Sequence, residues 1–167
     1  VAFILRMLFI ATLDNSVDVW GDWWDELGWR LAQGQGFWVA NPYFPDAGRF
    51  YSWRAPGFPF FLSLVYRLAG HHFLAAKIAL AAVSSLTAVI LFGVGSLIAG
   101  PAVGWWSAIL YAVYPPAIFW TGYLVPETLA AFLLVSLVLL CLAGMHYRTP
   151  LWFAAAGIAL GAGILTR

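Results

Sequence analysis

Residues 73–98 have the sequence FLAAKIALAAVSSLTAVILFGVGSLI, an apolar run that contains a single charge, Lys77. The rest of the chain has the same bias, since 63% of all residues are hydrophobic and 9% are charged. Soluble globular domains carry about 25% charged residues, so this composition indicates an integral membrane protein. The formal net charge is +1 and the chain has no basic run. Nucleic acid is therefore not expected as a partner.

Three further apolar segments follow this run. Gly100-Pro101, Pro126 and Pro150 separate them. Pro115-Pro116 lies inside one segment and should end or bend its helix, because proline lacks the N–H group and clashes with the preceding turn. We therefore expect an all-α, polytopic transmembrane helix bundle with four spanning helices. They are placed at residues 73–98, 102–119, 128–144 and 151–165.

The N-terminal part of the chain is more polar. Residues 1–13 are apolar, and no small-residue cleavage site of a signal peptide follows them, so they predict the end of a first membrane helix. Six of the seven acidic residues lie between positions 14 and 46, and this segment must be aqueous. The chain starts at Val1 and stops after GILTR. From this we expect the N-terminal part of a longer protein whose C-terminal remainder is missing.

Within the acidic loop, bulky apolar side chains recur at intervals of three and four residues, with charged residues between them. This spacing predicts an amphipathic helix on the membrane surface, where tryptophan is favoured. Gly34-Gln35-Gly36 should end the helix, because glycine tolerates the left-handed conformation that is common after a helix C-terminus. The apolar positions are Trp20, Trp23, Trp24, Leu27 and Leu31.

Residues 57–69 form a shorter apolar segment that starts within the corner Pro56-Gly57-Phe58-Pro59. About 13 residues of helix span roughly 20 Å, whereas the hydrocarbon core of a bilayer is about 30 Å thick. We expect this helix to be partly embedded without crossing the membrane. Residues 14–70 then form an extracytoplasmic loop with juxtamembrane helices.

Whether residues 57–69 cross the membrane decides which charged residues lie on the same side of it. If residues 57–69 do not cross, Glu127 and Arg167 return to the side of the acidic loop. If they do cross, Arg67 and Lys77 become cytoplasmic, as the positive-inside tendency favours, and the later charges lie away from that loop. We favour the first arrangement, because the length of the helix is a geometric limit and two basic residues are a weak orientation signal.

Four blocks of sequence, taken in order, resemble the N-terminal part of the GT-C glycosyltransferases. More closely, the chain is similar to the family 39-like membrane enzymes, which include protein O-mannosyltransferases, lipid A aminoarabinose transferases and many bacterial envelope sugar transferases. Each block alone is weak, whereas four in order are fairly specific. The blocks are GWRLAQGQGF (28–37), RAPGFPFFLSLVYRLAG (54–70), YPPAIFWTGYLVPETL (114–129) and AAAGIALGAGILTR (154–167).

This resemblance implies transfer of a sugar from a polyprenyl-phosphate donor to a lipid, glycan or protein acceptor on the extracytoplasmic side of the plasma membrane. No nucleotide sugar would be used directly. Some GT-C enzymes use a divalent metal ion, so the resemblance is compatible with a metal cofactor. No pair of acidic residues in this sequence identifies a metal site. The enzyme would be a multi-pass membrane protein whose partners are the lipid-linked donor, the acceptor and membrane lipids.

The family usually has an aspartate about four residues before an aromatic residue in the first surface helix. Alignment on the glycines at 34 and 36 places that aromatic at Trp24 and puts Trp20 at the aspartate's position. Asp22 is the closest local match for the catalytic acid. Asp18 and Asp25 are the alternatives.

Glycosyl transfer benefits from a carboxylate that orients or deprotonates the acceptor, and the leaving phosphate needs cationic stabilisation. We assign the first role to Asp22, which is otherwise a solvated residue of a surface helix. The second role falls to Arg54 and Arg167. Arg54 stands before the rigid corner, which can hold its guanidinium against a phosphate; it could equally bind lipid headgroups. Arg167 could simply flank a membrane helix.

Glu127 is the fourth candidate, and we group it with donor or substrate binding. It is the only acid after Asp46, and ionisable groups near membrane depth are costly enough to indicate function. A carboxylate just after Pro126, at a helix N-terminus, is also favourable through the macrodipole alone. The remaining candidate side chains are not assigned to the site. We expect them to lie at the membrane interface, to set the membrane topology or to pack against lipid or protein. These are Arg67, His71, His72, Lys77, Cys141 and Arg148.

The main alternative is a transporter or lipid flippase, in which broken helices and lone membrane charges bind and move a substrate without chemistry. It accounts for Pro115-Pro116 and Glu127. It accounts poorly for the acidic loop and the corner after Arg54, because a transporter concentrates its ligands at mid-membrane. A non-catalytic membrane subunit with the same fold is the third hypothesis.

Overall fold

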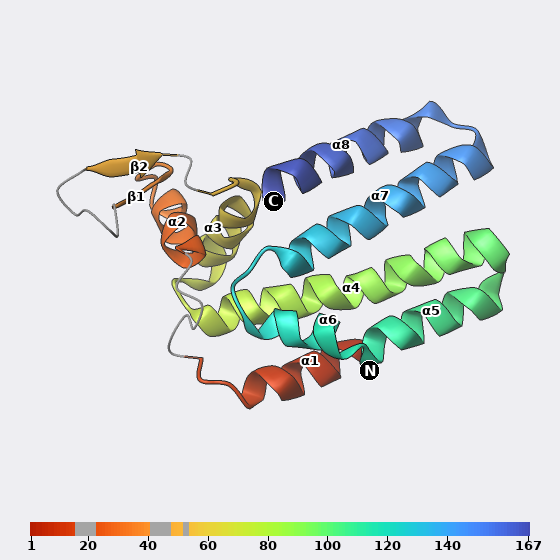
Figure 1. Cartoon of the computed structure of the whole chain (residues 1–167), viewed down its shortest axis with the longest axis horizontal. Coiled ribbons are helices and arrows are strands. Elements are labelled where there is room, and N and C mark those ends of the chain that lie inside the picture. Colours follow the sequence, from red (N-terminus) through yellow and green to blue (C-terminus); the bar gives the residue numbers. More distant parts are fainter. Residues whose placement is uncertain (16–22, 41–47, 52–53) are drawn as a thin grey trace.

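Long helices build most of the molecule, and a smaller unit covers one end of them (Figure 1). The structure is a computed structural model of the chain, and it describes residues 1–15, 23–40, 48–51 and 54–167. The expected helical membrane bundle is confirmed. Its helices are α4 (Phe73–Ala99), α5 (Pro101–Val113), α7 (Glu127–Tyr147) and α8 (Pro150–Thr166), with the shorter α1 (Ala2–Ala11) against α4.

Four spanning helices were expected, and candidate spans can be identified in the structure by length and composition. Within the described residues, α4 and α7 are long and apolar enough to cross a membrane, and α5 forms a third candidate with the segment that starts at α6 (Pro115–Phe119). That pair is bent by 57° at Pro115-Pro116, as predicted, and Tyr114 takes the extended backbone favoured before proline. α8, with 17 residues, belongs to the shorter apolar helices. The structure therefore has two or three candidate spans.

The unit at the end of the bundle, which we call the cap, consists of α2 (Trp24–Ala32), α3 (Gly57–Ala69) and a hairpin. It lies where α4 and α7 begin and α8 ends (Figure 1). In the hairpin, β1 (Trp38–Ala40) pairs antiparallel with β2 (Arg49–Tyr51). The hydrophobic pattern predicted α3 but not the hairpin, whose two strands have three residues each.

A buried apolar cluster packs the cap onto the bundle. α2 and α3 touch closely at Gly28, where an added Cβ would lie 2.6 Å from the Cβ of Leu62, so a larger residue there would force the helices apart. The ring of Trp24 meets the ring of Phe58 edge to face, with centroids 5.6 Å apart. The cluster contains Trp24, Phe58, Leu62 and Tyr66 of the cap with Ala76, Leu80 and Leu124.

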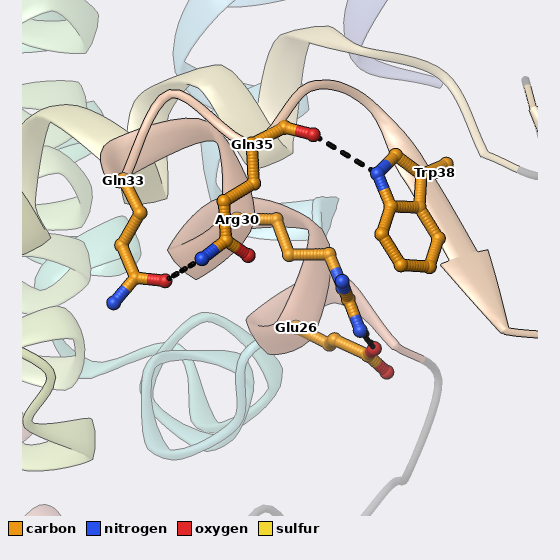
Figure 2. Close-up of polar contacts among 5 residues, drawn as sticks. All are labelled: Glu26, Arg30, Gln33, Gln35 and Trp38. Carbon is orange, nitrogen blue, oxygen red and sulfur yellow. Dashed lines mark hydrogen bonds and ion pairs between the residues drawn. The ribbon is translucent and has the colours of Figure 1, made fainter.

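Cationic and aromatic side chains join the hairpin to α2; Figure 2 shows Arg30 and Trp38 with their hydrogen-bond partners Glu26 and Gln35. Arg30 donates to the Glu26 carboxylate, with Nη2 2.6 Å from Oε1, and its guanidinium carbon lies 3.8 Å from the ring centroid of Trp38. Arg49 of β2 lies 4.2 Å from the same centroid. The Trp38 indole N–H donates to the carbonyl of Gln35 at 2.9 Å. These charged residues therefore hold the hairpin in place.

Lys77, which was expected to be interfacial, is buried inside the protein, with 2% of its surface exposed. Its ammonium group donates to Oδ1 of Asn15 at 2.9 Å and to the carbonyl of Asp14 at 3.3 Å. A buried ammonium needs such acceptors, because unpaired charges are very costly away from water. Lys77 thus ties the chain that leaves α1 to the first turns of α4.

Candidate functional site

A polar pocket of about 350 Å³ opens at the capped end of the bundle. Three of the four sequence candidates, Arg54, Glu127 and Arg167, line it together. They come from positions 54, 127 and 167, so the tertiary fold brings them to one place. We call this site the end pocket; its lining residues are Trp24, Arg54, Ala55, Val125, Pro126, Glu127 and Arg167.

The close contact of α3 with the end of α8 sets the distance between the two arginines. Arg54 precedes α3, and Arg167 follows α8 directly. At Gly57, an added Cβ would lie 2.8 Å from both the carbonyl oxygen of Leu165 and Oγ1 of Thr166. Because only glycine lacks this atom, Gly57 allows the first turn of α3 to approach the last turn of α8. The corner therefore brings Arg54 to the end of α8.

Glu127 lies between the bundle and the pocket as the first residue of α7. Its Oε1 is 3.9 Å from Nη1 of Arg167, whose side chain is 70% exposed, so this ion pair is weak and can rearrange. Its Oε2 is buried and has no hydrogen-bond partner among the described residues. A buried acceptor without a donor is costly, and a hydroxyl or amine of a bound ligand would satisfy it.

Arg54 is held beside an aromatic ring. Its guanidinium carbon lies 5.3 Å from the ring centroid of Trp24, a distance at which a cation is attracted to the ring face. Together, Arg54, Arg167 and Glu127 carry a formal charge of +1, the sum of two positive charges and one negative charge. The end pocket is therefore suited to an anionic group that also presents hydrogen-bond donors.

An apolar groove of about 490 Å³ starts at the same charged residues. It runs between α7 and α8, and both Glu127 and Arg167 lie at its polar end. Apart from these two, only alkyl side chains and one glycine line it. A charged pocket that continues into an apolar groove fits an amphiphile with an anionic head. The groove residues include Ala130, Leu134, Leu137, Leu160 and Ile164.

The candidate catalytic acid, Asp22, and its alternative Asp18 lie outside the described residues. Asp25, the other alternative, is described and is fully engaged in the cap. Its carboxylate accepts a hydrogen bond from the Tyr66 hydroxyl and lies 2.9 Å from Nε2 of His71. Asp25 is thus placed to hold α2 against α3, and it is not among the residues that line the end pocket.

We call Asp25, Tyr66 and His71 the cap clamp. The His71 ring stacks on Trp29 of α2, with centroids 4.6 Å apart and planes at 5°, and meets the Tyr66 ring edge to face. No periodic pattern in the sequence predicts this cluster, because Asp25 lies more than 40 positions from the other two residues and His71 lies in a turn. The only signal was the adjacent pair His71-His72, which had no partner at metal-ligand spacing.

Among the described residues, no group of three or more His, Cys, Asp or Glu side chains is placed to hold a metal ion. Asp25 and Glu127 belong to different clusters. Asp25 is bound in the cap clamp, and Glu127 pairs with Arg167.

The fold and the pocket define a multi-pass membrane protein with a cationic site at one end of its helices, next to an apolar groove. Residues 53–167 match the dolichyl-phosphate-mannose-protein mannosyltransferase family, and the chain belongs to this family. Membership implies a membrane glycosyltransferase that depends on a lipid-phosphate sugar donor. The matched segment contains Arg54, Glu127 and Arg167, and it begins after Asp22. Comparisons with curated proteins and with solved structures gave no match.

Proposed function

We propose that the protein transfers a sugar from a polyprenyl-phosphate donor to an envelope lipid, glycan or protein acceptor on the extracytoplasmic side of the plasma membrane. The observation that carries this proposal is the meeting of Arg54, Glu127 and Arg167 in the end pocket. A transporter or flippase would also bind an anionic lipid, but family membership favours chemistry at this site over movement of the lipid.

The two arginines would bind the donor phosphate. A guanidinium offers donors in a planar fork that matches phosphate oxygens. Negative charge on the phosphate grows as the bond to the sugar breaks, so cations placed beforehand stabilise the transition state more than the ground state. Arg54 is held by Trp24, whereas Arg167 is mostly exposed. Arg54 is therefore the preformed part of the phosphate site.

The polyprenyl chain would lie in the groove between α7 and α8. The groove starts at Glu127 and Arg167 and is otherwise apolar, so a lipid with its phosphate at the arginines can continue directly into it. Glu127 would accept hydrogen bonds from sugar hydroxyls through its buried Oε2, which has no partner among the described residues. Carboxylates suit this role because they only accept hydrogen bonds when ionised.

Asp22 would act on the acceptor. In the proposed step, its carboxylate takes the proton of an acceptor hydroxyl or amine, whose lone pair forms the new bond to the anomeric carbon of the sugar. The bond from that carbon to the phosphate oxygen breaks, and its electron pair leaves with polyprenyl phosphate. In the sequence, Asp22 stands two positions before Trp24, which lines the pocket.

The test is to incubate the purified protein with a panel of polyprenyl-phosphate sugars labelled in the sugar, together with lipid, glycan and protein acceptors. The account predicts labelled acceptor and free polyprenyl phosphate in equal amounts for one donor. In parallel, the same donors are placed in one leaflet of sealed vesicles that contain the protein. Movement of the donor to the other leaflet with no labelled acceptor would favour the transporter.

A further inference from the structure

Arg6 is a buried charge that the proposed chemistry does not use. It lies in α1 and is 0% exposed, although a charged side chain inside an apolar bundle is costly unless it is paired or hydrogen-bonded. Its Nε donates to Oγ of Ser84 on α4 at 2.8 Å. The guanidinium carbon lies 5.6 Å from the Tyr111 ring centroid. Arg6 therefore joins α1, α4 and α5 at one point.

The backbone acceptors of Arg6 explain why it lies there. Its Nη1 donates to the carbonyl of Ala112 at 3.1 Å, and its Nη2 has a longer contact of 3.5 Å to the carbonyl of Tyr111. In a continuous helix, these carbonyls would accept from the N–H groups of residues 115 and 116. Those residues are Pro115 and Pro116, which have no N–H group. The Tyr111 carbonyl accepts instead from the N–H of Tyr114 at 3.3 Å, with Arg6 as a second donor. The Ala112 carbonyl receives from Arg6 the donor that Pro116 cannot supply.

Ser84, which accepts the hydrogen bond from Arg6, also contacts the segment that follows the bend. Oγ of Ser84 lies 3.4 Å from the Tyr111 hydroxyl and 3.4 Å from the carbonyl of Ala117 in α6. α6 leads through the 3-10 turn η2 (Trp120–Gly122) and four further residues to Glu127. Tyr111, Ala117 and Glu127 also line one pocket of about 210 Å³ between this segment and α7. Arg6 is thus connected through Ser84 to the segment that leads to Glu127.

We propose that Arg6 is a positioning residue for Glu127: it holds the break between α5 and α6 in its bent form, and the bent segment sets where α7 starts. This proposal rests on the proposed function, because it assigns Arg6 a part in sugar transfer. A guanidinium suits the task, since its planar fork can reach a side-chain oxygen and two carbonyls at once. Arg6 also places a cation at the C-terminus of α5, where the helix dipole favours one.

The first measurement is thermal unfolding of the purified intact protein in detergent. Arg6→Met should lower the Tm by about 4–10 °C, because it leaves the buried carbonyl of Ala112 without its donor and removes the hydrogen bond to Ser84. In a Pro115→Ala/Pro116→Ala background, the restored N–H groups can bond to the same carbonyls, so Arg6→Met should change the Tm by less than about 2 °C. Equal shifts in both backgrounds would overturn the link between Arg6 and the prolines.

A second variant keeps the test valid if Arg6→Met does not fold. Arg6→Lys retains the charge but presents a single ammonium group in place of the fork, so its Tm should fall between those of the wild type and Arg6→Met. If Arg6→Met alone yields no folded protein, it is expressed in the Pro115→Ala/Pro116→Ala background. Folded protein in that background supports the proposal, and unfolded protein overturns it. Arg148→Met is the matched control, since Arg148 is exposed and follows the far end of α7.

The second measurement is the rate of sugar transfer by the same variants. Displacement of a binding group by about 1 Å can cost up to 100-fold in rate, so Arg6→Met should lower kcat/KM on the order of 10- to 100-fold, with Arg148→Met unchanged. Wild-type kcat/KM in a folded Arg6→Met would overturn the positioning role. If the wild type transfers no sugar from any donor, the proposed function is overturned. The Tm comparison still tests the link between Arg6 and the proline pair.

Discussion

Two aspartates of the first loop have similar positions in the sequence but different expected roles. The carboxylate of Asp25 contacts Tyr66 and His71 in the cap clamp, so we expect it to have a structural role. Asp22 remains the proposed catalytic acid. Asparagine has nearly the same shape as aspartate, and its amide can still accept from a hydroxyl, but it cannot take a proton from an acceptor.

We therefore predict opposite results for the two asparagine variants. Asp22→Asn should lower kcat on the order of 100- to 10,000-fold, the usual effect of losing a general base, while binding of the polyprenyl-phosphate sugar stays near the wild-type value. Asp25→Asn should keep most of the activity. The measurements are steady-state transfer and donor binding for both variants and for Asp18→Asn. A large loss of kcat in Asp25→Asn, with activity kept in Asp22→Asn, would contradict this prediction and identify Asp25 as the catalytic acid.

Removal of the whole Asp25 side chain tests the clamp itself. Asp25→Ala removes the hydrogen bonds that its carboxylate makes with Tyr66 and His71, and such losses cost about 1–3 kcal/mol of unfolding free energy. Hydrogen exchange of the backbone amides in α2 should then rise, because the clamp joins α2 to α3 and to the turn before α4. Unchanged exchange in α2 would show that the apolar cluster around Trp24 and Leu62 is enough to hold it.

At the scale of elements, the contact of α3 with α8 should control the end pocket. Gly57→Ala places a Cβ 2.8 Å from Leu165 O and Thr166 Oγ1, so the first turn of α3 must move away and carry Arg54 with it. We predict that kcat/KM for the donor falls on the order of tenfold. The matched control is Gly161→Ala in α8, where an added Cβ meets no atom within 4 Å. Equal activities of the two variants would contradict this prediction.

The sequence predicted the helices better than their contacts. Long apolar runs located α4 and α7, a shorter apolar segment located α3, and Pro115-Pro116 placed the bend. The hairpin was missed because its strands are short and its stabilising stack joins Arg30 and Arg49 through Trp38, which lie far apart in sequence.

The site was predictable only in part. Isolated charges next to prolines or at helix ends drew attention to Arg54, Glu127 and Arg167, which the structure brings to one pocket. Arg6 and Lys77 also stand out in the sequence as single charges in apolar runs. Their roles could not be predicted, because they depend on carbonyl and side-chain acceptors in other segments. Those acceptors are identified by the fold and not by local sequence. Asp22 remains a prediction from the resemblance.

At the scale of the whole molecule, the account requires residues 14–55 and Arg167 to share the extracytoplasmic side. α3 has 13 residues and belongs to the cap, and the meeting of Arg54 with Glu127 and Arg167 is the arrangement expected if α3 does not cross. We predict that a cysteine at position 46 labels from outside in sealed cells, whereas cysteines at 100 and 148 do not. The background is Cys141→Ser, which removes the native thiol. Labelling of 100 or 148 from the same side as 46 would contradict this topology.

The central claim is that the end pocket is where the lipid-linked phosphate is bound and released. The most direct measurement is the transfer rate of Arg54→Lys and Arg54→Ala in the intact protein, with donor binding measured alongside. Arg54→Lys keeps the charge but loses the planar fork, and Arg54→Ala loses both. The account predicts that the rate falls in that order, with a loss on the order of 100-fold for Arg54→Ala and none for the exposed control Arg148→Ala. Transfer at the wild-type rate by Arg54→Ala would contradict the claim.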